Sequence, residues 1–204
     1  MGLLAAVALG ALVATVLVVR SLLSDDPGSH RADPATELSQ QPTAPPAPAV
    51  GCWDGSPAAT AAECSLPSGE AGLRWVFPAM ASQKCAAATA EGGPGLVTRI
   101  LCLHRLEDGT RVGVGYFEWQ SVAAGSDFYA SQGLTASEVA GPDGKTVQLA
   151  FSGTSGDQTK AAALFVDAPF SFTITYPSTA TISQADQQAL APRPADQLRG
   201  APVG

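Results

Sequence analysis

Charged residues and histidines are scarce in this sequence. Charged side chains make up 14% of its 204 residues, and only two histidines occur, whereas about 25% charged residues is usual for a globular protein. The 11 basic residues are scattered along the chain. This argues against a nucleic-acid-binding protein, because such proteins meet phosphates with clustered basic groups.

Motifs that identify a catalytic reaction are missing too. The sequence contains no G-x-S-x-G, no H-E-x-x-H and no P-loop. Gly113-x-Gly115 begins like a dinucleotide-binding loop, but Glu118 takes the place of the third glycine. We therefore expect no enzymatic activity, no cofactor and no metal site.

One long apolar run is present near the start of the chain. Residues 2–19 contain no charged side chain, and a helix that spans a bilayer needs about 20 apolar residues. A cleaved signal peptide is the alternative, but it would carry basic residues before the run and a small-x-small site soon after it. Neither occurs here, so residues 1–23 are predicted to be a transmembrane anchor.

The segment after the anchor, residues 24–50, contains six prolines among Ser, Asp, Gln and Ala. Such a composition buries too little apolar surface to offset the entropy of ordering, which predicts a disordered linker. Residues 51–204 follow as one domain by length. Four of the 18 acidic and two of the 11 basic residues precede this domain, which leaves it 14 and 9, a formal net charge of −5.

The cysteines indicate on which side of the membrane the domain lies. All four follow the apolar run, and disulfides persist in oxidising compartments outside the cytoplasm. Arg20, on the C-terminal flank of the run, favours the opposite orientation, but one arginine weighs less than four cysteines. We expect an extracytoplasmic domain. Because no basic residue precedes the run, the sequence leaves open whether Met1 is the true start or a cytoplasmic part precedes it.

The four cysteines, Cys52, Cys64, Cys85 and Cys102, permit three pairings. We favour Cys52–Cys64, which closes a loop of turn residues, and Cys85–Cys102, which ties a predicted helix to a strand. Each bridge would stabilise the fold by about 3 kcal/mol. A zinc site is the alternative, but the intervening lengths of 11, 20 and 16 residues hold no C-x-x-C pair, and His104 is the only imidazole nearby.

Apolar alternation predicts most strands of the domain. Residues 170–176 alternate without error and form a predicted hairpin with 161–166, while 96–106 and 111–120 form a second one. Further strands are expected near 72–78 and 147–151. Both faces of 111–120 are apolar, which indicates an inner strand whose glycines leave room for a helix.

Helices are predicted over residues 82–90 and 122–131, and from Ser183, where Asp186 completes a capping pattern, to Pro192. The expected fold is α+β. It has a mainly antiparallel sheet of about five to six strands, two or three short helices and disulfide staples, after one transmembrane helix.

Aromatic residues are the best candidates for a ligand surface. Trp53 and Trp119 qualify because exposed indole rings are good binding anchors, and Tyr116 and Glu118 share the predicted strand of Trp119. A packed core position is the alternative for each tryptophan.

Catalytic candidates are weaker. Glu118 and Asp127 would serve as a glycosidase pair only if their carboxylates came within about 5–10 Å of each other, and nothing in the sequence brings them together. His104 is a conceivable base, but in a strand it shares a face with Ile100, Cys102 and Leu106, which indicates a packed or edge histidine.

Five parts of the sequence share a resemblance: Cys52-Trp53-Asp54-Gly55, Cys64-Ser65-Leu66-Pro67, Gly72-Leu73-Arg74-Trp75-Val76-Phe77-Pro78 with Cys85, Glu118-Trp119 and residues 193–200. They resemble the extracytoplasmic domains of certain actinobacterial single-pass membrane proteins, some of them linked to cytoplasmic serine/threonine kinases. The resemblance covers roughly residues 51–200 and implies an architecture, with no catalytic residues to carry over. No kinase domain precedes the apolar run here, so signalling across the membrane would need another chain or a longer gene product.

Together these features predict a membrane-anchored extracytoplasmic domain that senses or binds a ligand without catalysis. Its expected partners are the membrane, through the N-terminal helix, and a cell-wall ligand or an envelope protein. The alternative is a structural or interaction protein of the cell envelope that docks on a partner protein. A cell-wall hydrolase is the third hypothesis, and it requires Glu118, Asp127 or His104 to meet in a pocket.

Overall fold

The computed structural model describes residues 50–88 and 93–203. The chain divides into residues 1–45 and residues 46–204, and all described residues belong to the second, compact unit. The predicted anchor and the predicted linker up to residue 49 lie outside the described residues. Val50, the last residue of the predicted linker, begins a strand. In the part of the chain that the structure describes, no helix is long and apolar enough to cross a membrane.

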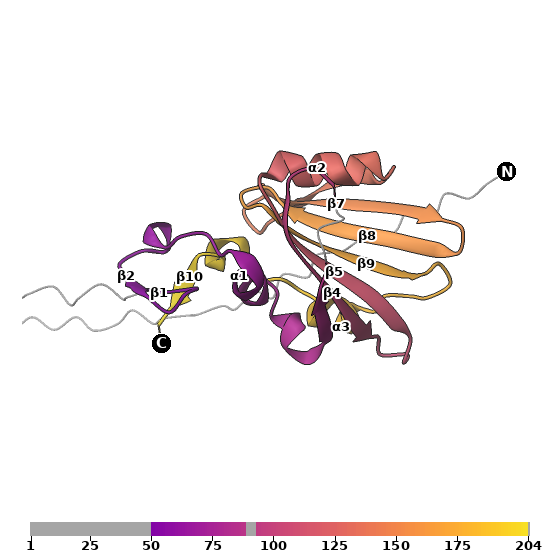
Figure 1. Ribbon diagram of the computed structural model, residues 1–204, viewed down its shortest axis with the longest axis horizontal. Helices are drawn as coiled ribbons and strands as arrows, with labels where there is room; N and C mark the ends of the chain where they lie inside the picture. Colours follow the sequence, from indigo (N-terminus) through magenta and orange to yellow (C-terminus); the bar gives the residue numbers. More distant parts are fainter. Residues whose placement is uncertain (1–49, 89–92, 204) are drawn as a thin grey trace, which may run out of the picture. The chain divides into compact units, whose positions relative to one another are not determined.

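Strands dominate the described residues (Figure 1). They are β1 (Val50–Cys52), β2 (Pro57–Ala58), β3 (Lys84–Ala87), β4 (Leu96–Arg105), β5 (Arg111–Trp119), β6 (Thr135–Ala140), β7 (Thr146–Ser155), β8 (Gln158–Phe165), β9 (Phe170–Pro177) and β10 (Gly200–Pro202). The α-helices are α1 (Gly69–Val76), α2 (Val122–Ser131) and α3 (Gln184–Ala189). Three 3-10 turns complete the fold: η1 (Ala61–Glu63), η2 (Pro78–Ser82) and η3 (Ala195–Gln197).

The described strands form two antiparallel sheets. The large one has seven strands in the order β3-β4-β5-β9-β8-β7-β6, and the small one has the order β10-β1-β2. This confirms the α+β class and the antiparallel sheet, and it also confirms the two hairpins β4–β5 and β8–β9. The large sheet exceeds the predicted size because β3 and β6 add a strand at each edge. Strand β5 is an inner strand, as predicted.

Two elements exchange their predicted type. Residues 82–90 are predicted to be a helix, but their described part contains strand β3, in which Cys85 pairs with Cys102 of β4. Pairing with β4 and the disulfide override the helix propensity of the alanines, because propensity is a weak preference per residue. Conversely, the expected strand near 72–78 is mostly helix α1, which buries Leu73 and Val76 on one side.

The two other helix predictions are confirmed. Helix α2 has the predicted bounds, and its N-cap Ser121 accepts a hydrogen bond from the backbone N–H of Ala124. Helix α3 begins after Ser183 with a capping box in which Ser183 and Asp186 satisfy each other's backbone N–H groups.

The large sheet has a different cover on each face. One face, called the α1 face, packs on α1, η2 and the C-terminal segment through residues such as Ile100, Val112, Val114, Tyr116 and Ile174. The opposite face, called the α2 face, packs on α2 through Phe117, Trp119, Phe151, Ala162 and Leu164. Alternation along β5 sends even-numbered side chains to the α1 face and odd-numbered ones to the α2 face.

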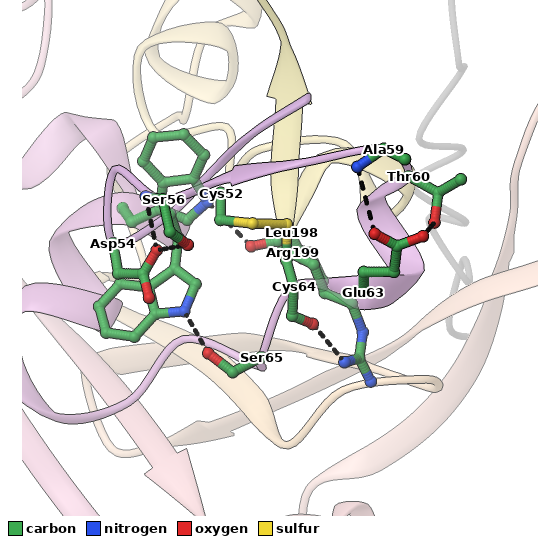
Figure 2. Close-up of a disulfide and its surroundings, with 12 residues drawn as sticks. Cys52, Asp54, Ser56, Ala59, Thr60, Glu63, Cys64, Ser65, Leu198 and Arg199 are labelled. Atoms are coloured by element: carbon green, nitrogen blue, oxygen red, sulfur yellow. Dashed lines mark hydrogen bonds between the residues drawn. A yellow bond between two sulfur atoms is a disulfide. The ribbon is translucent and has the colours of Figure 1, made fainter. Parts of the chain in front are cut away.

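The small sheet is held by one of the two disulfides. Both bridges have the favoured pairing, Cys52–Cys64 and Cys85–Cys102, and no described cysteine is free. Figure 2 shows Cys52–Cys64 beside Arg199, whose guanidinium donates a 2.9 Å hydrogen bond to the carbonyl of Cys64. The C-terminal segment is thereby fastened to the segment that enters the domain.

Candidate binding face

Three of the four predicted ligand-surface residues are buried. Tyr116 is 0%, Trp119 1% and Glu118 8% exposed, so they offer a ligand no surface and this prediction is wrong for them. Tyr116 and Glu118 lie on the α1 face and Trp119 on the α2 face. The two apolar faces of β5 are both covered at the end of the strand that contains Tyr116, Glu118 and Trp119, so these residues belong to the core.

Glu118 has a structural role in place of the predicted ligand contact. Its Oε2 accepts hydrogen bonds from the backbone N–H of Gly69, at 2.8 Å, and from the hydroxyl of Thr98, at 2.7 Å. Gly69 is the first residue of α1, and the N-cap Ser68 makes no side-chain cap. Glu118 therefore caps helix α1 from a neighbouring strand, where a negative charge is favourable.

Trp53 lies in the turn directly after β1 and is half-buried. Its Nε1–H donates a 3.1 Å hydrogen bond to the hydroxyl of Ser65, and its backbone N–H donates to the carbonyl of Arg199 at 3.0 Å. The structure does not bring Trp53 together with Tyr116, Glu118 and Trp119, which lie on the large sheet.

The proposed catalytic carboxylates do not meet either. Glu118 lies on the α1 face, whereas Asp127 is exposed on α2, which covers the opposite face. His104 lies on the α1 face, where its Nδ1 is 3.4 Å from Nε2 of Gln83, a residue that also accepts a hydrogen bond from Tyr116. This confirms His104 as a packed histidine. Among the described residues, no group of three His, Cys, Asp or Glu side chains is arranged to hold a metal ion.

Among the described residues, no helix lies over part of the α2 face. Helix α2 has ten residues, about 15 Å of length, and it covers the end of the sheet that contains Phe117, Trp119 and Leu164. The remaining part, called the open face, consists of Leu101, Leu103, Gly113, Gly115, Thr173, Thr175 and Lys160. On it Leu101 is 41% and Leu103 58% exposed.

The register of the sheet orders the open face in two rows. Leu103 pairs with Gly113, Gly113 with Thr175, and Thr175 with Lys160, so one row runs from β4 through β5 and β9 to β8. The adjacent row contains Leu101, Gly115, Thr173 and Ala162 in the same order. Leucines therefore lie at one side of the open face, a lysine at the other, and small residues between them.

Because Gly113 and Gly115 have no side chains, the middle of the open face is formed by backbone. A Cβ built on Gly113 would meet no atom within 4 Å, whereas one on Gly115 would lie 2.8 Å from the ring of Phe117 and 2.9 Å from Oγ1 of Thr173. Space above Gly113 is thus empty, and Gly115 makes room for its neighbours. At Gly113 the predicted close packing of a helix is not found, because no described atom lies within 4 Å of a Cβ built there.

A hollow of about 550 Å³ lies over the open face. Its walls include Phe128 and Gln132 of α2 at one side, and Arg99 at the end where α2 begins to cover the sheet. A second hollow of about 280 Å³ adjoins it, and the two share Gln132, Lys160 and Thr175. The larger volume falls in the range of small-molecule sites, about 300–1,000 Å³.

Both charged residues among the described lining of the larger hollow, Arg99 and Lys160, are basic. The ammonium group of Lys160 donates a hydrogen bond to Oε1 of Gln132, and Lys160 is half-buried. Burial and, second, the positive charge of Arg99 lower the pKa of Lys160 below its usual value. An anion placed here would relieve both effects, because it would offset the repulsion between the cations and replace lost solvation.

Sequence reasoning missed the open face, although signals for it were present. Arg99, Leu101 and Leu103 alternate with Ile100, Cys102 and His104, so β4 carries apolar residues toward both faces. The two glycines were noticed but interpreted as space for a helix. Lys160 gave no signal of its own, because only the pairing of β8 with β9 places it beside Thr175.

The chain was compared with family models, curated proteins and solved structures, and none of them matches it.

Proposed function

We propose that this protein is a membrane-anchored extracytoplasmic domain that binds a ligand without catalysis, and that the open face is its binding site. The observation that carries the proposal is the open face, the part of the α2 face that the described helices leave uncovered. Leu101 and Leu103 are exposed above a hollow of suitable size. Burying such apolar surface would stabilise the folded domain. An apolar surface that stays exposed is therefore typical of a binding site.

The compartment rests on the disulfides. The two bridges, Cys52–Cys64 and Cys85–Cys102, indicate an oxidising environment of the extracellular type. The anchor in residues 1–23 is part of the proposal. Peptide mapping under non-reducing conditions, on protein taken from its native envelope, should recover both bridges and no free thiol among the four cysteines. Four alkylatable cysteines would remove the support for an outside location.

Binding is tested by thermal unfolding of residues 46–204, the compact unit that contains both core clusters and both disulfides. A panel of envelope small molecules is added, and a ligand at a hundred times its dissociation constant should stabilise the domain by about 2.7 kcal/mol. The melting temperature would rise by several degrees.

The binding site is tested by filling the hollow. Gly113→Leu places a side chain in empty space on an extended strand, so it should abolish the ligand-induced shift and leave folding intact. Ser152→Leu is the matched control, because Ser152 is exposed on β7 and faces the other side of the sheet. A shift that survives Gly113→Leu would contradict the proposed site.

A second candidate function, docking on an envelope protein, is favoured by a different observation. Val97, Leu101 and Leu103 are exposed along the same strand, β4, and a row of exposed apolar residues is typical of a protein interface. Under this hypothesis no small molecule shifts the melting temperature. Photo-crosslinking from position 103 in intact cells should then capture one partner, and Gly113→Leu should prevent its capture.

A further inference from the structure

We propose that the open face takes an amphipathic monoanion, a molecule with one carboxylate headgroup and one apolar chain, and that Lys160 holds the headgroup. This inference rests on the proposed function and names the ligand class of the same site. The juxtaposition that supports it is the row Lys84–Leu103–Gly113–Thr175–Lys160, in which Leu103 lies beside the exposed edge residue Lys84, while Lys160 is the lysine that lines the hollow.

The dimensions of this row fit a single-chain molecule. Neighbouring strands lie about 4.8 Å apart, so three strand spacings separate β4 from β8, about 14 Å. Between them the floor consists of Gly113, Gly115, Thr173 and Thr175, with Thr173 buried. An extended chain could lie on this floor with its end against Leu101 and Leu103 and its headgroup at Lys160.

The charge pattern selects an anion. The domain carries a formal net charge of −5, yet both charged residues in the described lining of the hollow are cations. Lys160 is bonded to the neutral amide of Gln132, and no described carboxylate forms an ion pair with it. A carboxylate could therefore accept from the ammonium group, with the hydroxyl of Thr175 lining the same place. One charge-assisted hydrogen bond is worth about 1.5–3 kcal/mol.

A second copy of the chain is a less suitable occupant. Two open faces stacked on each other would bring like cations together in a partly buried interface, which is unfavourable. A concentration-dependent dimer that Gly113→Leu dissociates would overturn the inference in favour of this occupant. Analytical ultracentrifugation of residues 46–204 provides that measurement.

The headgroup is tested with three probes that share one chain: octanoate, octanol and octylamine, all below the concentration at which they form micelles. We expect calorimetric titration of residues 46–204 to show octanoate binding at least tenfold tighter than octanol, a difference of about 1.4 kcal/mol. Octylamine should bind weaker than both. Equal affinities for octanoate and octanol, both lost in Gly113→Leu, would overturn the anionic headgroup and leave the proposed function intact. Failure of all three probes to bind would overturn this inference, while the unfolding panel decides the proposed function separately.

The role of Lys160 is tested with two variants. Lys160→Met keeps the apolar stem and removes the charge, so octanoate should fall to the affinity of octanol while octanol is unchanged. Lys160→Arg should retain the preference. The matched control is Lys145→Met, which removes the same charge from an exposed turn where Lys145 lies 3.4 Å from Asp143, and it should change nothing. A preference for octanoate that survives Lys160→Met would overturn the assignment.

Ionic strength gives a measurement that needs no variant. Salt weakens the attraction between a carboxylate and the half-buried Lys160, although less than it weakens an exposed pair. The preference of the wild-type protein for octanoate over octanol should therefore shrink as salt is added. A preference that is independent of salt would overturn the electrostatic basis of the inference.

Discussion

The guanidinium of Arg193 lies over the indole of Trp75, with its central carbon 3.7 Å from the ring centroid. Its Nε also donates a 2.7 Å hydrogen bond to the carbonyl of Trp75, and the indole Nε1–H donates at 2.8 Å to the carbonyl of Leu198. Helix α1 and the C-terminal segment are thus joined by one stacked pair and two side-chain hydrogen bonds. These contacts hold residues 190–199, which contain only the short turn η3 between α3 and β10, against α1.

Replacing Arg193 by lysine should destabilise the domain. A lysine keeps the charge but loses the planar stacking and the Nε bond, so we expect Arg193→Lys to lower the free energy of unfolding by about 1 kcal/mol. Urea denaturation followed by circular dichroism measures the change. Arg74→Lys is the control, because Arg74 forms an exposed ion pair with Glu70 and such pairs contribute little. Equal losses in both variants would contradict a special role for stacking.

Glu118 should behave as a helix cap, with no effect on ligand binding. Glu118→Ala leaves the N–H of Gly69 and the hydroxyl of Thr98 without their acceptor, which should lower the free energy of unfolding by about 3 kcal/mol. Glu118→Gln retains an acceptor oxygen and should cost less than half as much. Affinity for a ligand on the open face should stay within twofold in the glutamine variant, because Glu118 faces the other side of the sheet. A large loss of affinity with unchanged stability would restore Glu118 as a ligand contact.

Ser171 connects two aromatic side chains inside the core under α2. Its Oγ accepts from Nε1–H of Trp119 at 2.8 Å and lies 2.7 Å from the hydroxyl of Tyr129. Ser171→Ala leaves both polar groups buried without this partner, so the free energy of unfolding should fall by about 2 kcal/mol. Combining it with Tyr129→Phe in a double-mutant cycle should give less than the sum of the single effects. Additive losses would show that the two groups act independently.

Alkaline pH should unfold the domain by ionising buried tyrosines. Burial raises the pKa of Tyr116 from 10.0 to about 12, against a smaller opposite effect of its hydrogen bond to Gln83, and burial raises the pKa of Tyr129 as well. Because the folded pKa exceeds the unfolded one, this contribution to stability is complete below pH 10 and is lost as the pH rises toward 12. Tyrosinate absorbance and circular dichroism, recorded together, should change in that interval. Titration of Tyr116 and Tyr129 near pH 10 in the folded state would contradict the burial.

Much of the large sheet could be predicted because the alternation of apolar and polar residues in its inner strands is visible in the sequence. Residues 170–176 alternate apolar and polar side chains, and one residue in two must face the core. The edges could not be predicted in this way. The alanine-rich run around Cys85 favours a helix in isolation, and only its pairing with β4 makes it a strand. Residues 72–78 contain the helical spacing of Leu73, Val76 and Phe77, but their apolar content also fits a strand.

The binding face was less accessible to sequence reasoning, for a physical reason. The extent of the open face depends on how much of the sheet α2 covers. That coverage is set by the length of α2 and by the order of the strands. The aromatic residues that suggested a ligand surface, such as Trp119, are the ones that the core needs most. Lys160 is 57 residues away from Leu103 in the sequence, and only the antiparallel order of β4, β5, β9 and β8 places them in one row.

The pairing of Val50 with Pro202 in the small sheet has a topological consequence. Two paired residues on adjacent strands lie about 5 Å apart, so the polypeptide reaches this domain and departs from it at one location. A short peptide could therefore join the two ends into a circle, and new ends could be opened at the turn around Gly109. The same geometry makes the domain transplantable: inserted into a surface loop of a host protein, it would require the host to separate its own chain by little more than one strand spacing.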